Sequence, residues 1–132
     1  MTVDDAAETV FSGKRIMIVE DEILLALDLE LMLKDEGVEV LGPVGNIAQA
    51  LDLLSHHSPD AVILDMNLGG KSSAPIVAEL MQGDIPFVVT SGYSETYADI
   101  PAASEVPFVR KPYVMPELLG VLRSILSATT RG

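Results

Sequence analysis

Five polar residues stand where apolar runs of this sequence end: Glu20, Asp21, Asp65, Thr90 and Lys111. Each run is too short for a typical helix and is followed by turn-forming residues, which is typical of strands buried in a parallel sheet. The carboxyl ends of parallel strands share one edge of the sheet, and ligands bind just outside that edge. We therefore expect three carboxylates, one hydroxyl and one ammonium group to lie close together.

The chemistry that suits this set of groups is phosphoryl transfer to a carboxylate. Three carboxylates close together repel one another unless a cation lies among them. Oxygen ligands in a partly hydrated pocket favour Mg²⁺, which takes one or two carboxylates, waters and phosphate oxygens. An aspartate oxygen such as that of Asp65 can act as a covalent nucleophile. Lys111 and Thr90 can hold the oxygens of the transferred group.

Each of these residues also has a simpler structural interpretation when it is considered alone. Carboxylates such as Glu20 and Asp21 are favoured at the start of a helix by its dipole, and Asp21 is predicted to cap the next helix. Thr90 alone would be a strand-end hydroxyl bonded to the backbone, and Lys111 alone would be a solvated residue that leaves a strand. Their joint occurrence at successive strand ends favours the chemical interpretation.

The overall composition fits one globular domain. The chain has 132 residues, of which 48% are hydrophobic, and no apolar run approaches the roughly 20 residues that span a bilayer. The N-terminus is acidic and lacks the basic region of a secretory signal, so we expect a cytoplasmic protein. The net charge of -12 disfavours direct binding of nucleic acid or of a membrane surface. The sequence has no cysteine, which excludes disulfides and thiol chemistry.

The pattern along the chain predicts five strands that alternate with five helices. The strands are expected at residues 14–19, 38–42, 61–64, 86–90 and 106–110. The helices are expected at residues 23–36, 47–57, 74–81, 94–104 and 115–127. Such alternation implies right-handed βαβ units and an α/β fold whose parallel sheet is covered on both faces.

Local signals refine these elements. The first helix takes its apolar pattern from Ile23, Leu24, Leu27 and Leu31. Gly37 is expected to end that helix, and Asn46 is expected to cap the next one. Residues 43–45 are predicted as a turn and residues 66–73 as a loop. Residues 94–104 have a poor apolar period and contain a proline, so this helix is expected to be short or irregular.

Four motifs, taken together, resemble the receiver domain of bacterial two-component response regulators. They are Ile18-Val19-Glu20-Asp21-Glu22, Ile63-Leu64-Asp65-Met66-Asn67-Leu68, Val89-Thr90-Ser91-Gly92 and Phe108-Val109-Arg110-Lys111-Pro112. The resemblance covers residues 14 to 127. It implies a flavodoxin-like (βα)5 three-layer sandwich with a five-stranded parallel sheet of order 2-1-3-4-5.

The resemblance also implies a phosphorylation site with a bound Mg²⁺. Asp65 would be the phospho-acceptor. Asp21 would bind the ion directly and Glu20 through a water, and the backbone carbonyl of Asn67 would be a further ligand. Lys111 would pair with the oxygens of the phosphoryl group.

Two further residues would respond to phosphorylation in such a domain. Thr90 would close on the phosphoryl group, and Phe108 matches the aromatic residue that rotates inward on activation. Residues 67–70 and 86–93 also look like those of a stand-alone receiver subgroup with a Phe-Ala-Thr-Gly-Tyr type motif, the FATGUY receivers. Helix four can be altered in that subgroup.

The implied function is that of a single-domain response regulator. A sensor histidine kinase or a phosphotransfer protein would phosphorylate Asp65 with Mg²⁺ bound. The domain would signal to an unknown downstream protein, or would act as a shuttle or sink for phosphate. It would catalyse only its own phosphorylation and dephosphorylation. Residues 1–12 are expected to form a leader, residues 13–128 the receiver domain and residues 129–132 a tail.

Two alternatives stay open at this point. The first is a Mg²⁺-dependent phosphatase with an aspartyl nucleophile, but such enzymes place a second aspartate two residues after the nucleophile, where this chain has Asn67. The second is a degenerate receiver that is used only for docking. The presence of Asp65, Thr90 and Lys111 argues against this second alternative.

Overall fold

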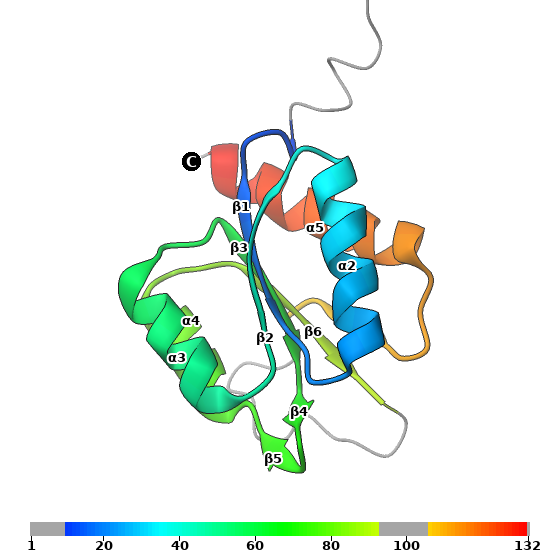
Figure 1. The fold of residues 1–132 in the computed structure, drawn as a ribbon. Helices are drawn as coiled ribbons and strands as arrows, with labels where there is room; N and C mark the ends of the chain where they lie inside the picture. The colour runs from blue at the N-terminus through cyan, green and yellow to red at the C-terminus, as the bar shows by residue number, and fades with distance from the viewer. Residues whose placement is uncertain (1–9, 93–105, 132) are drawn as a thin grey trace, which may run out of the picture.

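The computed structural model describes residues 10–92 and 106–131, and a parallel β-sheet lies at its centre (Figure 1). The five strands lie in the order β2-β1-β3-β6-β7. Their bounds are β1 Arg15–Val19, β2 Glu39–Val44, β3 Ala61–Asp65, β6 Phe87–Ser91 and β7 Phe108–Arg110. All four neighbouring pairs are parallel, so the predicted 2-1-3-4-5 order is confirmed.

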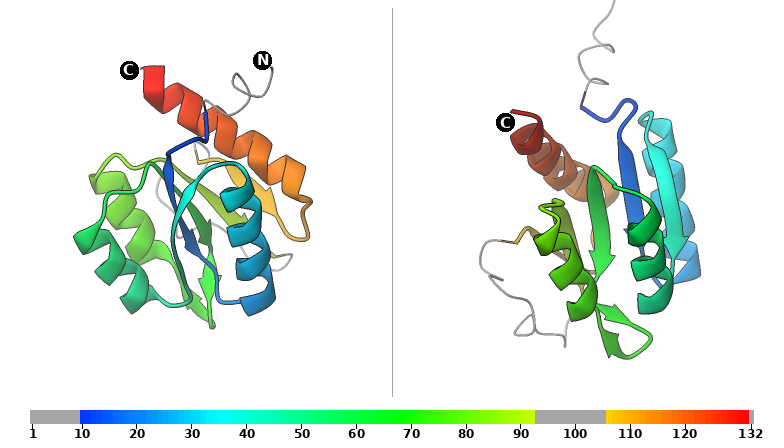
Figure 2. Two further views of the ribbon diagram at one scale, coloured as in Figure 1. Left: turned by 45° about the horizontal axis from the view of Figure 1, so that its top comes forward. Right: turned by 90° about the vertical axis from the view of Figure 1, so that its left-hand side faces the viewer.

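Helices cover both faces of this sheet and make the fold a three-layer sandwich. Helices α2 (Ile23–Asp35) and α5 (Met115–Arg131) lie on one face, and α3 (Ile47–His56) and α4 (Ala74–Gln82) lie on the other (Figures 1 and 2). The flavodoxin-like α/β fold class is therefore confirmed. The helix predicted at residues 94–104 lies outside the described residues. No helix of the described chain has the length and apolar character needed to cross a membrane.

Each face of the sheet has its own apolar core, because successive strand side chains point to opposite faces. In β1, Met17 and Val19 pack on the side of α3 and α4, whereas Ile16 and Ile18 pack on the side of α2 and α5. The central strand β3 is buried along its whole length, as expected for a strand covered on both faces. Phe11, which falls in the predicted leader, is also fully buried on the α2 and α5 side.

Helix α2 turns a different face to the sheet from the one that its apolar pattern suggests. Its buried residues are Ala26, Leu29 and Leu33. The residues that define the predicted pattern are exposed instead: Ile23, Leu24, Leu27 and Leu31, with 47–79% of their surface accessible. Apolar residues occupy positions all around this helix, so its periodicity predicts a helix without selecting the buried face.

Three helix ends were predicted, and two of them are confirmed. Gly37 follows α2 with a φ of +87°, the left-handed conformation that glycine adopts most easily. Asn46 caps α3, because its Oδ1 accepts a hydrogen bond from the N–H of Gln49 at 2.8 Å. The predicted cap by Asp21 is wrong. The N-cap residue of α2 is Glu22, which makes no side-chain capping bond.

The turn predicted at residues 43–45 is wrong at its first two positions, because β2 continues through Pro43 to Val44. The carbonyl of Val44 accepts a hydrogen bond from the N–H of Glu20 at 2.9 Å. The pairing of β1 with β2 is irregular at this point, and Gly42 has a φ of +90°. A bulge at this point disrupts the ladder locally and bends the strand.

The loop predicted at residues 66–73 contains a small antiparallel hairpin, formed by β4 (Asn67–Leu68) and β5 (Lys71–Ser72). Gly69 and Gly70 make its two-residue turn with φ values of +60° and +87°. Two-residue hairpin turns of this type need positive φ at both positions, which explains the glycine pair. The hairpin projects beyond the sheet at the end where β3 finishes (Figures 1 and 2).

Candidate functional site

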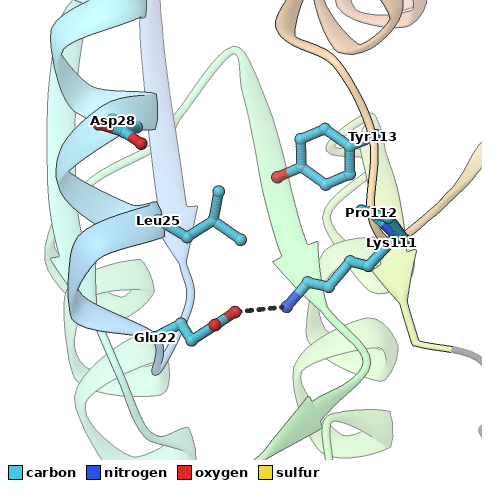
Figure 3. Close-up of a pocket in the computed structure, with 6 residues that line it drawn as sticks. All are labelled: Glu22, Leu25, Asp28, Lys111, Pro112 and Tyr113. Carbon is cyan, nitrogen blue, oxygen red and sulfur yellow. Dashed lines mark ion pairs between the residues drawn. The ribbon is translucent and has the colours of Figure 1, made fainter.

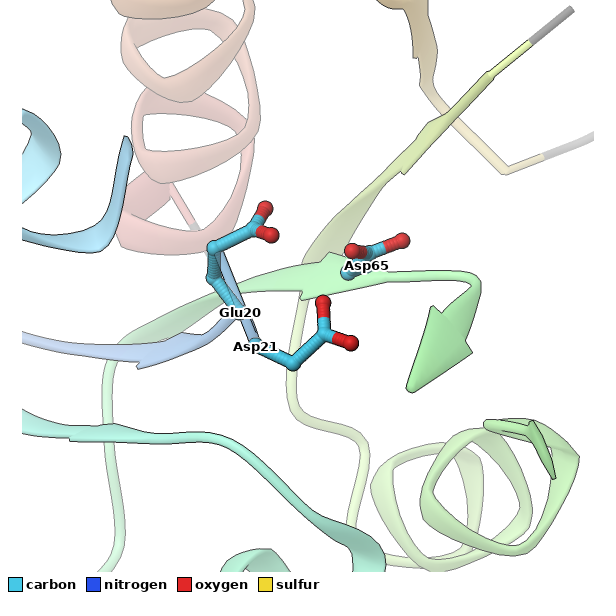
Figure 4. Close-up of side chains that lie close together, drawn as sticks. All are labelled: Glu20, Asp21 and Asp65. Carbon is cyan, nitrogen blue, oxygen red and sulfur yellow. The ribbon is translucent and has the colours of Figure 1, made fainter. Parts of the chain in front are cut away.

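Three carboxylates gather at the carboxyl edge of the sheet. Glu20 and Asp21 follow β1, and Asp65 is the last residue of the neighbouring strand β3. One oxygen atom from each of the three lies within 4.8 Å of those of the other two (Figure 4). Glu20 and Asp65 are buried, whereas Asp21 is exposed. The structure thus brings together the three carboxylates that the sequence singled out.

Lys111 supplies a positive charge to this group. Its Nζ lies 3.1 Å from Oδ2 of Asp65 and 3.1 Å from Oε1 of Glu20. The carboxylate of Glu22 is further away, with Oε1 at 3.6 Å. The N–H of Lys111 donates to the carbonyl of Ser91 at 2.7 Å, which fixes the residue just beyond β7. One ammonium group is therefore shared by three carboxylates.

Burial makes the ionised carboxylates of the site costly. Burial, and then the charge of Asp65, raise the pKa of Glu20 to about 7. Burial likewise raises the pKa of Asp65, against the opposing effects of the Asn67 N–H and of Lys111. For Lys111, burial acts to lower the pKa, but the charges of Asp65 and Glu20 outweigh it and raise the pKa above its ordinary value. A further cation in this pocket would relieve the repulsion between the carboxylates.

Both oxygens of Asp65 have a defined partner. Oδ2 faces Lys111, and Oδ1 accepts a hydrogen bond from the N–H of Asn67 at 3.1 Å. Asn67 begins the hairpin, whose turn also bonds to the site, because the N–H of Gly69 donates to Oδ2 of Asp21 at 2.8 Å. The hairpin therefore links the loop after Asp65 to the exposed carboxylate Asp21. In the sequence, this hairpin is signalled by the glycine pair that separates its two short strands.

Thr90 lies in β6, the strand next to β3, and Phe108 lies in β7, the strand beyond β6. Thr90 stands opposite Asp65 in the ladder between β3 and β6. Its Oγ1 is buried and has no hydrogen-bond partner among the described residues. Phe108 in β7 pairs with Val89 in β6 and packs, half-buried, against the core on the α3 and α4 side. Residues 93–105, between these strands, lie outside the described part of the chain.

The donor atoms of the acidic group suit a hard divalent cation. Glu20, Asp21 and Asp65 present carboxylate oxygens only, and Mg²⁺ prefers oxygen ligands. Because Asp21 is exposed, an ion at this position would also remain open to water, which Mg²⁺ gives up reluctantly. The residues present therefore fit the metal that the sequence suggested.

Two residues at the edge of the site give no signal in the sequence by themselves. Glu22 is the third member of an acidic run, and Tyr113 follows Lys111-Pro112. In the fold they line a pocket of about 470 Å³ between α2 and the segment after β7 (Figure 3). The hydroxyl of Tyr113 is buried there and has no hydrogen-bond partner within the described chain. Only the packing of these distant segments shows that Glu22 and Tyr113 line the same pocket.

The fold and the site together define the class of protein. The chain belongs to the response regulator receiver domain family, whose model matches residues 16–123. Receiver domains are phospho-accepting signalling modules of two-component systems and do not turn over external substrates as ordinary enzymes do. The acidic group at the sheet edge is the magnesium-binding type of site found in such domains.

Two of the similar proteins of known sequence are named transcriptional regulatory proteins. The chain is 30% identical over 117 residues to the transcriptional regulatory protein PdtaR of Mycobacterium tuberculosis, covering 86% of this chain and 57% of that protein. It is 29% identical over 124 residues to the transcriptional regulatory protein PrrA of Mycobacterium bovis, covering 90% of this chain and 52% of that protein. The chain thus spans about half the length of the curated relatives it matches.

Two solved structures are similar along most of their length. The solution structure of SdrG from Sphingomonas melonis Fr1 is 36% identical, with a TM-score of 0.72 over 86% of this chain and 97% of SdrG. The response regulator TrrA from Thermotoga maritima is 26% identical, with a TM-score of 0.73 over 85% of this chain and 98% of TrrA. TrrA was solved in complex with Mg²⁺ and BeF.

Proposed function

We propose that Asp65 accepts a phosphoryl group from a phosphohistidine, supplied by a sensor histidine kinase or a phosphotransfer protein. The observation that carries this proposal is the environment of the Asp65 carboxylate. Its Oδ1 is held by the N–H of Asn67 and its Oδ2 by Lys111, at the open edge of a rigid sheet. In the reaction, an Asp65 oxygen bonds to phosphorus while the bond from phosphorus to the imidazole nitrogen breaks, which leaves an acyl phosphate.

We assign the metal ligands to Glu20, Asp21, Asp65 and the backbone carbonyl of Asn67. A bound Mg²⁺ would neutralise charge on the phosphoryl oxygens during transfer. The protein's part is to hold Asp65 in place and to keep Lys111 beside it. Fixed positive charge that is already in position where negative charge develops is an efficient way to stabilise a transition state.

The response to phosphorylation is assigned to Lys111, Thr90 and Phe108. Lys111 would pair with an oxygen of the new phosphoryl group. Thr90, whose buried hydroxyl has no hydrogen-bond partner in the described chain, would donate to another oxygen. Phe108 would change position in the adjoining strand. Such a response is a population shift caused by a local change of charge.

The signal would leave the domain through protein contacts, or the domain would act as a shuttle or sink for phosphate. We also propose that the chain acts in the cytoplasm as a stand-alone receiver of the FATGUY type. The similarity to SdrG, which extends over 97% of that chain, supports the stand-alone role. Phosphotransfer profiling against purified, autophosphorylated histidine kinases would identify the donor, because the cognate kinase transfers its phosphoryl group to this chain faster than the other kinases do.

The surface on which the phosphodonor docks is assigned to the start of α2. A groove of about 270 Å³ there is lined by Glu20 and Asp21 together with Ile23 and Leu27. The groove therefore joins exposed apolar side chains directly to the acidic site. We infer that a protein that brings a phosphohistidine to the acidic site packs an apolar contact surface against Ile23 and Leu27.

The direct test is incubation with acetyl phosphate and Mg²⁺, followed by intact-protein mass spectrometry. We expect the mass of one phosphoryl group, lost on treatment with hydroxylamine, which cleaves acyl phosphates. Asp65→Asn should gain nothing, whereas Asp52→Asn, which removes an exposed carboxylate on α3, should label like the parent. No gain in the parent, or equal gain in Asp65→Asn, would reject phosphorylation at Asp65.

A further inference from the structure

The hydroxyl group of Tyr113 is buried without a hydrogen-bond partner among the described residues. A buried polar group that lacks a partner costs free energy, so nearly all such groups in folded proteins are satisfied. A phenylalanine would fill the same space without this cost. The hydroxyl of Tyr113 is therefore free, within the described chain, to donate to a carboxylate that moves within reach in another state of the protein.

The surroundings of this hydroxyl identify candidate partners. It points into the pocket between α2 and the segment after β7, toward α2 (Figure 3). The pocket is lined by Glu22, Leu25, Asp28, Lys111, Pro112 and Tyr113. Burial, and then the charge of Glu20, raise the pKa of Tyr113 to about 12, so the hydroxyl keeps its proton. It is therefore a donor that faces a pocket with carboxylate acceptors.

Glu22 is the carboxylate most easily released from its present partner. Its Oε1 lies 3.6 Å from the Nζ of Lys111, whereas the nearest oxygens of Glu20 and Asp65 lie at 3.1 Å. Its side chain is also 69% exposed, so the pair is screened by water. Any new anion that draws Lys111 away would first weaken the contact with Glu22.

We propose that Tyr113 is a positioning residue for the phosphorylated state. When Lys111 turns to the phosphoryl group on Asp65, the hydroxyl of Tyr113 donates to the carboxylate that Lys111 gives up, and Glu22 is that carboxylate. This bond relieves the pull of Glu22 on Lys111 and draws the start of α2 toward the segment after β7. The inference rests on the proposed phosphorylation of Asp65.

The test uses Mg²⁺ with beryllium fluoride as a stable mimic of the phosphoryl group, and thermal melting as the readout. Without the mimic, Tyr113→Phe should melt at the same temperature as the parent or higher, because an unpartnered hydroxyl is lost. With the mimic, Tyr113→Phe should need a roughly tenfold higher beryllium fluoride concentration for the same stabilisation, as expected for a lost hydrogen bond to a charged group. A purely structural role would shift both measurements in the same direction.

A double-mutant cycle identifies the partner. Glu22→Gln and Tyr113→Phe should be non-additive in the presence of the mimic and additive in its absence. Asp28→Asn removes a charge from the same pocket and is the matched control, expected to be additive with Tyr113→Phe in both conditions. Equal coupling for Asp28 and Glu22, or coupling that is independent of the mimic, would overturn the assignment.

The same measurements separate the two proposals. If the parent and Asp65→Asn respond identically to the mimic, the phosphorylation site itself is wrong and the role of Tyr113 fails with it. If the parent responds, Asp65→Asn does not, and Tyr113→Phe matches the parent at every concentration, only the role of Tyr113 is overturned.

Discussion

At the scale of single residues, the raised pKa of Glu20 makes the stability of the metal-free protein depend on pH. The pKa is about 7 in the fold, against 4.5 for an ordinary glutamate, so the folded state binds this proton more tightly than the unfolded chain. This contribution to stability is complete below pH 4.5 and is lost as the pH rises through 7. Urea unfolding should be measured at acidic and at slightly basic pH. Between these two conditions, the free energy of unfolding of the parent should fall by at least about 1 kcal/mol more than that of Glu20→Gln, since each pKa unit is worth about 1.4 kcal/mol. Equal losses in the two proteins would contradict the assignment.

Among the residues of the site, Lys111 is the one whose replacement should lower the free energy of unfolding most. Lys111→Met leaves the buried carboxylates of Glu20 and Asp65 without their ammonium partner. Because unpairing a buried charge is costly, we expect a loss of about 3 kcal/mol in the free energy of unfolding near neutral pH, partly recovered by Mg²⁺. Lys34→Met is the control, because Lys34 pairs with Glu30 on the surface of α2, and it should cost less than about 1 kcal/mol. Similar losses for the two variants would show that the carboxylates need no cation.

At the scale of elements, the join between β1 and β2 depends on Gly42. This residue has a φ of +90°, and a Cβ atom there would lie 2.9 Å from the N of Val44 and 3.0 Å from the O of Ile18. Both contacts are with backbone, which cannot move aside easily. Gly42→Ala should therefore lower the free energy of unfolding, measured in urea, by at least about 2 kcal/mol. This cost combines the steric clash with the strain of a positive φ at a residue that has a Cβ atom. Gly45→Ala, where the nearest atom would lie at 3.5 Å, should cost less than about 1 kcal/mol. A mild effect at Gly42 would mean that the bulge adapts.

Helix α2 is the element expected to meet the phosphodonor. Replacing Ile23 and Leu27 together with alanine removes exposed apolar surface from the groove beside the acidic site. We expect phosphotransfer from the histidine kinase found by profiling to fall roughly tenfold, whereas labelling by acetyl phosphate should stay near the parent rate. Met81→Ala removes an exposed apolar side chain from α4 and should leave both rates unchanged. A drop in both rates would mean that the substitutions disturb the acidic site itself, and it would contradict a role of this groove in docking.

At the scale of the whole molecule, a net charge of -12 makes every cation stabilising to some degree, so specific and general effects of Mg²⁺ must be separated. A bound ion stabilises the fold by an amount that grows with concentration, about 2.7 kcal/mol at 100 times its dissociation constant. Mg²⁺ should therefore raise the free energy of unfolding well beyond NaCl of equal ionic strength. Asp21→Asn should lose most of this excess, because Asp21 is the exposed carboxylate of the acidic group. Equal effects of the two salts on the parent would argue against a specific ion site.

The sequence by itself determined the order of the sheet strands and of the described helices along the chain, the carboxyl-edge position of Asp65 and the convergence of the acidic residues. These follow from short-range apolar patterns and from the rule that parallel strands end at one edge. Only the tertiary structure decided how Lys111 is shared, because its partners Asp65 and Glu20 stand 46 and 91 residues away. The buried face of α2 and the unpartnered hydroxyl of Tyr113 were likewise decided by packing. Contacts between distant segments leave no local period in the sequence from which they could be predicted.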